Sequence, residues 1–173
     1  IAGGENFYRI DDDPSMSAAP HIYLTYVFGD IAGLEEKIGV RAREIFGRML
    51  FVQNSLAGTN AEFGKLYRDK YRLRPQIIHY PRGGGFLEGH VHDYEPQRYG
   101  LILNLSRPGV DYDVGGTYFD TPKGRVEGPD VGKFGRLVIF KYNLFHGIKP
   151  VDCGLDLNWG SNDGKISAVL PLF

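Results

Sequence analysis

Apolar residues recur with two different periods along the chain, and the period changes near Pro75. Before this residue, the β-branched and aromatic run HIYLTYVF at 21–28 predicts a strand. From Asp30 onward, apolar residues are spaced by three and four positions, which predicts an amphipathic helix. The apolar positions of this helix are Leu34, Ile38, Ala42, Ile45, Met49 and Val52.

A shorter helix is predicted to follow the first one. The sequence TNAE at 59–62 matches a capping box, and a helix that begins there would stop before Arg74, because Pro75 comes next. The apolar residues of this second helix are Phe63, Leu66 and Tyr67. Both helices are expected to pack on a sheet through their apolar sides.

After Pro75 the chain consists of short apolar runs separated by Gly and Pro, a pattern typical of a β-sandwich or barrel. The runs are 76–80, 86–92, 99–105, 115–119, 135–140, 146–151 and 165–173. The 11 Tyr, 11 Phe and 24 Gly in 173 residues also indicate short strands and tight turns. We therefore predict a mainly β fold with flanking helices, as a single domain 1–173 in which residues 1–75 buttress a β-barrel core at 76–173.

The charge balance excludes some classes of partner. Twenty Lys and Arg against 21 Asp and Glu give a formal charge of −1, so no global field attracts nucleic acid or an anionic membrane. No apolar run approaches the roughly 18 residues of a membrane span. We expect neither nucleic acid nor a membrane as a partner.

The cysteine content indicates a compartment. Cys153 is the single cysteine, so it cannot form a disulfide within the chain, which fits a reducing cytoplasm. The first residues contain no signal-peptide core. Because the chain opens on Ile1 rather than on methionine, we expect a stretch of the native N-terminus to be missing from it.

Histidines provide the strongest chemical signal. His90 and His92 are separated by one residue, and side chains at i and i+2 of a strand leave the same face. Burying two imidazoles together without a ligand would leave several nitrogen atoms to satisfy. His146 follows another apolar strand and provides a distant third ligand. The three histidines predict a metal site on a β-barrel that leaves positions open for substrate.

Other motifs have simpler interpretations. RGGGF at 82–86 is interpreted as a turn, because a strand follows it rather than the helix that a phosphate-binding loop needs. Cys153 has no recognisable base partner and is expected to be an inert thiol. His21 and His79 are interpreted as structural histidines, and the acidic tract at 11–13 as a solvated segment.

Over residues 76–173 the sequence resembles the iron(II)- and 2-oxoglutarate-dependent dioxygenases, in particular the prolyl-hydroxylase-like group. The motifs that carry this resemblance occur in the family's order and are HYPRGGGFLEGH, LILNLS, DVGGTYF, GRLVIFKYNLFHGIKPV and GKISAVLPLF. The resemblance implies the double-stranded β-helix fold, a jelly-roll or cupin-like barrel. It also implies iron binding by His90 and His146.

The resemblance further implies how 2-oxoglutarate is held. The family's final strand carries a basic residue, any residue and then Ser, which places Lys165 and Ser167 on the distal carboxylate of the cosubstrate. Tyr80, which precedes the first iron-binding histidine in this motif, is expected to donate a hydrogen bond to 2-oxoglutarate. The expected reaction is hydroxylation of a small-molecule substrate, with succinate and CO2 as co-products.

The sequence departs from the family pattern at two points. Lys165 stands where the family more often has Arg, and it lies nineteen residues beyond His146, farther than usual, with an inserted loop between them. The family pattern at the iron is His-x-Asp, but the residue two after His90 is His92. Strand parity favours His92 as the third ligand, and Asp93 is the alternative if a bulge rotates it inward.

Two other functions fit parts of the sequence. A cupin-type metalloenzyme also uses His-x-His, a following Glu and a distant His, although Glu95 comes one residue early for that motif. A non-catalytic barrel that binds a metal or small ligand is the other alternative, but it has no need of a carboxylate anchor. The substrate itself is not specified, although Arg82, Arg98 and Arg107 flank the site and would suit an amino acid or a related acid.

Overall fold

The computed structural model describes residues 5–7, 20–28 and 37–173. The predicted start of the long helix at Asp30 and the acidic tract at 11–13 lie outside the described residues. Within them, no helix is long and apolar enough to cross a membrane.

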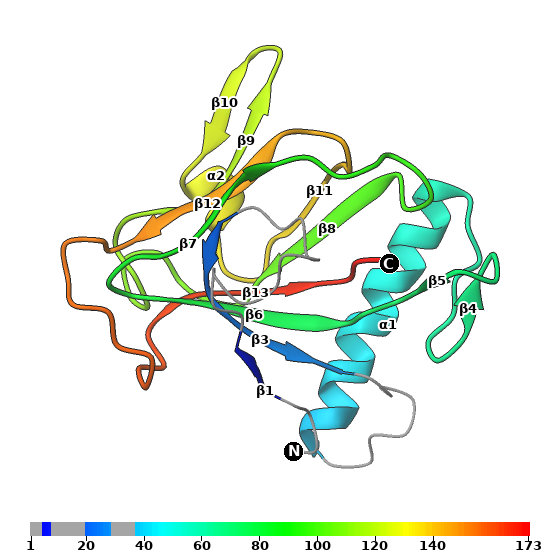
Figure 1. The fold of residues 1–173 in the computed structure, drawn as a ribbon, viewed down its shortest axis with the longest axis horizontal. Helices are drawn as coiled ribbons and strands as arrows, with labels where there is room; N and C mark the ends of the chain where they lie inside the picture. Colours follow the sequence, from blue (N-terminus) through cyan, green and yellow to red (C-terminus); the bar gives the residue numbers. More distant parts are fainter. Residues whose placement is uncertain (1–4, 8–19, 29–36) are drawn as a thin grey trace.

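Two antiparallel sheets dominate the described structure (Figure 1). The six-stranded sheet has the order β1 (Glu5–Phe7), β3 (Leu24–Val27), β6 (Gln76–Pro81), β13 (Gly164–Val169), β8 (Tyr99–Asn104) and β11 (Leu137–Lys141). The five-stranded sheet has the order β10 (Gly124–Glu127), β9 (Gly116–Thr121), β12 (His146–Val151), β7 (Gly85–His90) and β2 (His21–Ile22). Each of the seven predicted runs after Pro75 overlaps one of these strands, so the mainly β prediction is confirmed.

The predicted strand at 21–28 is divided between the two sheets. His21 and Ile22 pair with β7 in the five-stranded sheet, whereas Leu24–Val27 pair with β6 in the six-stranded sheet. Tyr23 stands at the break, with its ring at 4.3 Å from that of His21 and 5.6 Å from that of Tyr80. The segment therefore joins the two layers, which an unbroken strand could not do.

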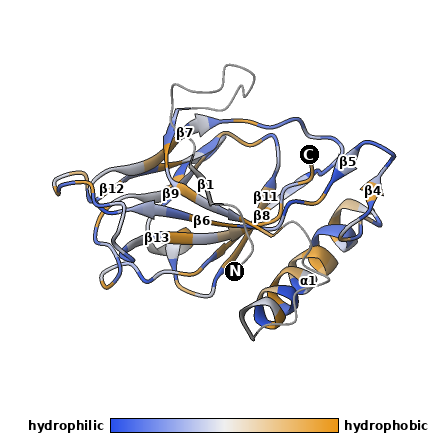
Figure 2. Ribbon diagram, turned by 60° about the horizontal axis from the view of Figure 1, so that its bottom comes forward, coloured by the Kyte–Doolittle hydropathy of each residue, from blue (hydrophilic) through white to orange (hydrophobic). Residues whose placement is uncertain are grey.

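The long helix α1 (Lys37–Ala57) covers the outer face of the six-stranded sheet (Figure 2). Ala42, Phe46 and Met49 lie on one side of the helix and are buried against the sheet residues Leu101 and Ala168. The helix ends where Gly58 adopts a positive φ of 65°, a conformation that favours glycine at a helix C-terminus. The apolar side of this helix therefore packs on the six-stranded sheet.

The predicted helix after Thr59 does not form, and that prediction is wrong. Residues 66–72 instead make a hairpin of β4 (Leu66–Tyr67) and β5 (Tyr71–Arg72). Thr59 Oγ1 donates to Asn54 Oδ1 at 2.7 Å, and the Ala61 amide donates to the same oxygen at 3.1 Å. Since the threonine hydroxyl closes the turn after α1, it does not cap a new helix.

The inner faces of the two sheets enclose a second apolar interior. Tyr80 of β6 and Ile148 of β12 belong to one cluster there, and Ile102 of β8 and Phe119 of β9 belong to another. A turn at 82–84 joins β6 to β7, as predicted for RGGGF. The short helix α2 (Pro129–Gly132) follows β10, and the β9–β10 hairpin projects beyond the barrel (Figure 1). Inward side chains of both sheets thus share one enclosed space.

Candidate functional site

The three predicted histidines come together at one end of the five-stranded sheet. His146 begins β12 and lies directly opposite His90, the last residue of β7. One ring nitrogen from each of His90, His92 and His146 lies within 4.8 Å of the others. Since a metal ion binds imidazole nitrogen at about 2.1 Å, a cluster of this size suits a single shared ion after a small shift.

His92 reaches the cluster by a different route from the predicted one. Strand β7 ends at His90, so strand parity alone does not aim His92. The His92 amide donates to Tyr142 O at 3.4 Å, and this bond continues the chain along the end of β11. The two Nε2 atoms of His90 and His92 then lie 3.1 Å apart.

Hydrogen bonds fix which ring nitrogen of two histidines is protonated. His90 Nδ1 lies 2.9 Å from Glu88 O, and His146 Nδ1 lies 2.8 Å from Leu144 O. A carbonyl oxygen only accepts, so each Nδ1 is the donor and each Nε2 of the neutral ring keeps its lone pair. This arrangement is typical of metal-binding histidines.

The histidines are neutral at physiological pH. Burial lowers the pKa of His90. Burial, together with a smaller effect of the nearby His90, lowers the pKa of His92 to about 4. Burial also lowers the pKa of His146 to about 4. Three neutral imidazoles, two of which have an Nε2 lone pair directed inward, therefore fit a divalent transition metal, and no protonated ring opposes its binding.

Aromatic side chains enclose the histidines on the barrel side. The Phe140 ring lies 4.6 Å from the His146 ring, and the Phe119 ring lies 5.9 Å from it. The Tyr142 ring lies 4.2 Å from the His92 ring. All three aromatic residues are buried, so the inner side of the cluster is largely apolar.

Glycine is required behind the histidine strands. A Cβ at Gly147 would lie 2.8 Å from Leu87 O and 2.8 Å from Tyr118 Oη, closer than a side chain tolerates. Gly147→Ala should therefore lower the free energy of unfolding by roughly 1 to 3 kcal/mol. Urea denaturation would measure this, with Gly154→Ala as the control, because nothing lies within 4 Å of a Cβ at Gly154. Equal stabilities would show that β7 and β12 are less closely packed than described.

Lys165 occupies the interior of the barrel. It is fully buried, and its Nζ donates to Asn104 Oδ1 at 2.8 Å and to Ser167 Oγ at 3.0 Å. No carboxylate of the described residues lies within 4 Å of it. Burial lowers its pKa to about 7. A buried amine without a carboxylate partner is suited to bind an anion.

Tyr80 lies beside Lys165. The two residues are paired in register between β6 and β13, so their side chains leave the same face of the sheet. Tyr80 is 3% exposed, and burial raises the pKa of its hydroxyl, which stays a hydrogen-bond donor. Tyr80 shares an apolar cluster with Ile148, two residues after His146 on β12. The lysine face and the histidine face are therefore opposite walls of one interior.

Sequence reasoning missed two polar residues of this interior. Asn104 is fully buried on β8, where its Nδ2 donates to Val131 O at 2.7 Å and its Oδ1 accepts from Lys165. Thr117 of β9 is 3% exposed, and its hydroxyl has no hydrogen-bond partner within the described part of the chain. The only sequence signal was a polar residue inside an otherwise apolar run, at Asn104 in LILNLS and at Thr117 in GGTYF.

The acidic alternatives to His92 lie outside the cluster. Asp93 is exposed and does not belong to the metal-binding group of the described residues. Glu95, the extra ligand expected for a cupin, is exposed and accepts from Arg98 Nε at 2.8 Å. Neither carboxylate joins the three histidines.

The three arginines predicted beside the site are engaged elsewhere. Arg82 Nε lies 2.7 Å from Asp152 Oδ2, and Arg107 pairs with Asp111 at 3.1 Å. Arg98 pairs with Glu95. Because their guanidinium groups have carboxylate partners within the chain, these arginines do not support an acidic substrate.

The histidines predicted to be structural have ordinary surroundings. His79 Nε2 lies 3.0 Å from Asp163 O, and His21 stacks on Tyr23. Cys153 is exposed.

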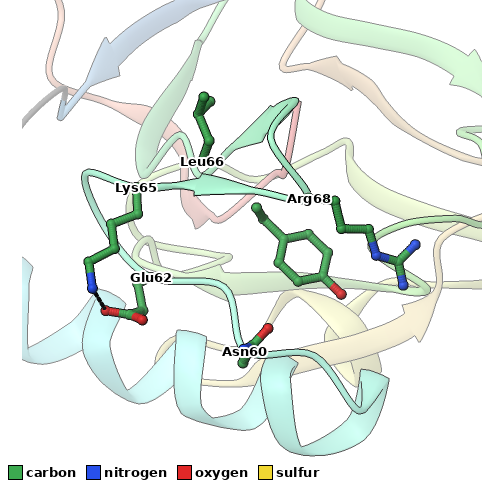
Figure 3. A pocket seen from close by; sticks show the side chains of 6 residues that line it. Asn60, Glu62, Lys65, Leu66 and Arg68 are labelled. Carbon is green, nitrogen blue, oxygen red and sulfur yellow. Dashed lines mark ion pairs between the residues drawn. The ribbon is translucent and has the colours of Figure 1, made fainter.

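A separate hollow of about 360 Å³ lies beside the β4–β5 hairpin (Figure 3) and is lined by Asn60, Glu62, Lys65, Leu66, Tyr67 and Arg68. Its most prominent contact is the ion pair of Lys65 with Glu62, at 2.6 Å, and none of the histidines lines it.

No family model and no curated protein matches the sequence. Solved structures do match. A prolyl-4-hydroxylase from Pseudomonas putida has a TM-score of 0.55 and 15% identity, over 87% of this chain and 68% of that one. An oxidoreductase of the 2OG-Fe(II) oxygenase family from Burkholderia pseudomallei has a TM-score of 0.53 and 16% identity, over 90% and 70%. The resemblance seen in the sequence thus extends to the three-dimensional structure, and the chain has the double-stranded β-helix fold of these two proteins.

Proposed function

We propose that this chain is an iron(II)- and 2-oxoglutarate-dependent oxygenase that hydroxylates a small molecule. The observation that carries the proposal is the pairing of two features in one barrel interior. A cluster of three neutral histidines stands on the five-stranded sheet, and the buried Lys165 stands on the opposite wall without a carboxylate partner. An iron ion would bind the histidine cluster, and a dicarboxylate would reach from the iron to the Lys165 amine.

In this proposal His90, His92 and His146 hold the iron. Two of the rings are oriented by their Nδ1–H donors, which leaves the Nε2 lone pairs directed inward. The chemistry that iron and 2-oxoglutarate supply when bound is activation of O2 for hydroxylation, with succinate and CO2 as co-products. Phe119, Phe140 and Tyr142 exclude water from the inner side of the cluster.

Lys165 binds the distal carboxylate of 2-oxoglutarate in the proposed complex. Ser167 and Asn104 hold the amine in place through the hydrogen bonds at 3.0 and 2.8 Å. An ammonium group has three N–H donors, so one remains for the ligand. The buried hydroxyls of Tyr80 and Thr117 are further donors facing the same interior.

The partner is proposed to be a small-molecule substrate. The formal charge of −1 provides no global attraction for nucleic acid. The exposed thiol of Cys153 suits a reducing compartment, and the proposed location is the cytoplasm.

The test is an anaerobic titration of the purified protein with Fe(II) and then 2-oxoglutarate. We expect one Fe(II) per chain and a weak visible absorption band that grows only when 2-oxoglutarate is added, because the three-histidine site leaves positions for a bidentate ligand. Succinate serves as the control ligand, since it has no 2-oxo group to chelate the metal. Iron binding without a spectral response to 2-oxoglutarate would favour a cupin-type metalloenzyme. Saturable binding of both ligands without turnover of 2-oxoglutarate in air would favour the non-catalytic barrel.

A further inference from the structure

The three clustered histidines are not oriented in the same way. His90 and His146 each donate from Nδ1 to the carbonyl oxygen two residues earlier, at 2.9 and 2.8 Å. His92 Nδ1 has no such partner among the described residues, and its only ring hydrogen-bond neighbour is His90 Nε2. Something other than a backbone carbonyl must therefore set the plane of the His92 ring.

Tyr142 provides that restraint. Its ring stacks on the His92 ring with a centroid distance of 4.2 Å and an interplanar angle of 12°. By comparison, the Phe140 ring is inclined by 56° to that of His146, so it packs at an angle rather than flat. A flat stack opposes tilting of the His92 ring out of the plane parallel to Tyr142. It opposes rotation of the ring within that plane much less.

Tyr142 is itself held firmly. It is 9% exposed, its amide donates to Arg98 O at 2.9 Å, and its carbonyl accepts from the His92 amide at 3.4 Å. The backbone bond and the ring stack thus join the same two residues. Burial raises the pKa of the Tyr142 hydroxyl, which keeps the ring neutral.

We propose that Tyr142 is a positioning residue that holds His92, through ring stacking, in the orientation needed to bind the metal. The inference rests on the proposed function only in that the histidines bind a divalent metal. It assigns a role to a residue just after β11, far in sequence from His92. It also explains how an imidazole is kept in place where the resembling family has a smaller carboxylate.

The experiment measures Co(II) binding to the full chain by visible absorption, in competition with a chelator. Tyr142→Leu removes the ring and should weaken Co(II) binding by about 10- to 100-fold, the usual effect of losing a residue that orients a metal ligand. Tyr142→Phe keeps the stack and should bind Co(II) as the wild type does. Tyr112→Leu is the control for general destabilisation, because Tyr112 is also buried but stacks on none of the three histidines.

A double-mutant cycle with His92→Ala isolates the pair. With His92 absent, Tyr142→Leu should cause no further loss of Co(II) affinity, and the cycle should show strong coupling between the two positions. Three results would overturn the positioning role. Tyr142→Leu could lose no more Co(II) affinity than Tyr142→Phe, or no more than Tyr112→Leu. The losses from Tyr142→Leu and His92→Ala could also be additive. If His90→Ala and His146→Ala bind Co(II) like the wild type, the metal site itself is wrong, and the proposed function fails together with this inference.

Discussion

Alanine at position 90, 92 or 146 should lower the affinity for Fe(II) by at least about 100-fold in each single variant. Losing a residue that merely orients a ligand costs about 10- to 100-fold, and each of these substitutions removes a donor atom outright. The three nitrogens lie within 4.8 Å of one another, so each histidine is placed to contribute equally. The expectation for His92 is the informative one, because the resembling family has a carboxylate there.

The measurement is anaerobic Fe(II) binding, with Asp93→Ala and Glu95→Ala as matched controls. Both carboxylates neighbour the cluster in sequence, but both are exposed and neither joins it. Each control variant should bind Fe(II) within a few-fold of the wild type. Should Asp93→Ala abolish binding while His92→Ala does not, the third ligand is Asp93, and the segment after His90 must rotate when the metal binds.

The sequence predicted the metal-binding histidines because His90 and His92 are two residues apart and His146 stands beside another apolar run. In the structure His90 ends β7 and His146 begins β12, and antiparallel pairing of these strands places them opposite each other. His92 was predicted for a reason that is only partly right, since β7 ends before it. In the structure its amide and its ring both contact Tyr142, which lies far along the chain, and no local pattern reveals this contact.

The wrong prediction of a helix after Thr59 has a similar cause. The capping-box pattern requires a free threonine hydroxyl, and Asn54 at the end of α1 takes that hydroxyl instead. The division of 21–28 between two sheets also depends on distant partner strands, β6 and β7, which the local sequence does not identify. Periodicity predicts that a segment is extended, but it does not predict which sheet the segment joins.

Lys165→Met should raise the 2-oxoglutarate concentration needed for half-saturation by about one to two decades, with little change in Fe(II) affinity. A charge-assisted hydrogen bond contributes roughly 1.5 to 3 kcal/mol, and Lys165 is fully buried. Methionine keeps the length and apolar stem of the side chain while removing the donor. The readout is the visible band in the anaerobic titration, followed as 2-oxoglutarate is added.

Lys149→Met is the matched control for this substitution. It removes the same charge from β12, but the Lys149 amine is half-exposed and pairs with Glu127 at 2.6 Å. The control should leave the 2-oxoglutarate requirement unchanged. An unchanged requirement in Lys165→Met as well would show that another group holds the cosubstrate, whereas a large loss of Fe(II) affinity would show that the substitution distorts the barrel.

The same variant should also be more stable than the wild type when no ligand is bound, and by an amount that depends on pH. Burial lowers the pKa of Lys165 to about 7 in the folded chain, while the unfolded chain has the ordinary value near 10.5. Between these values the unfolded state binds the extra proton, so the stability of the wild type rises with pH from about 7 to about 10.5. Below pH 7 both states are protonated, and the cost of burying the charge is then constant and at its largest.

The stabilisation by Lys165→Met, measured by urea unfolding, should therefore be greater at pH 6 than at pH 9. A difference that is the same at both values would mean that the amine meets a charged partner or water in solution, and Lys165 would then lack the unbalanced charge that the proposed anion site needs.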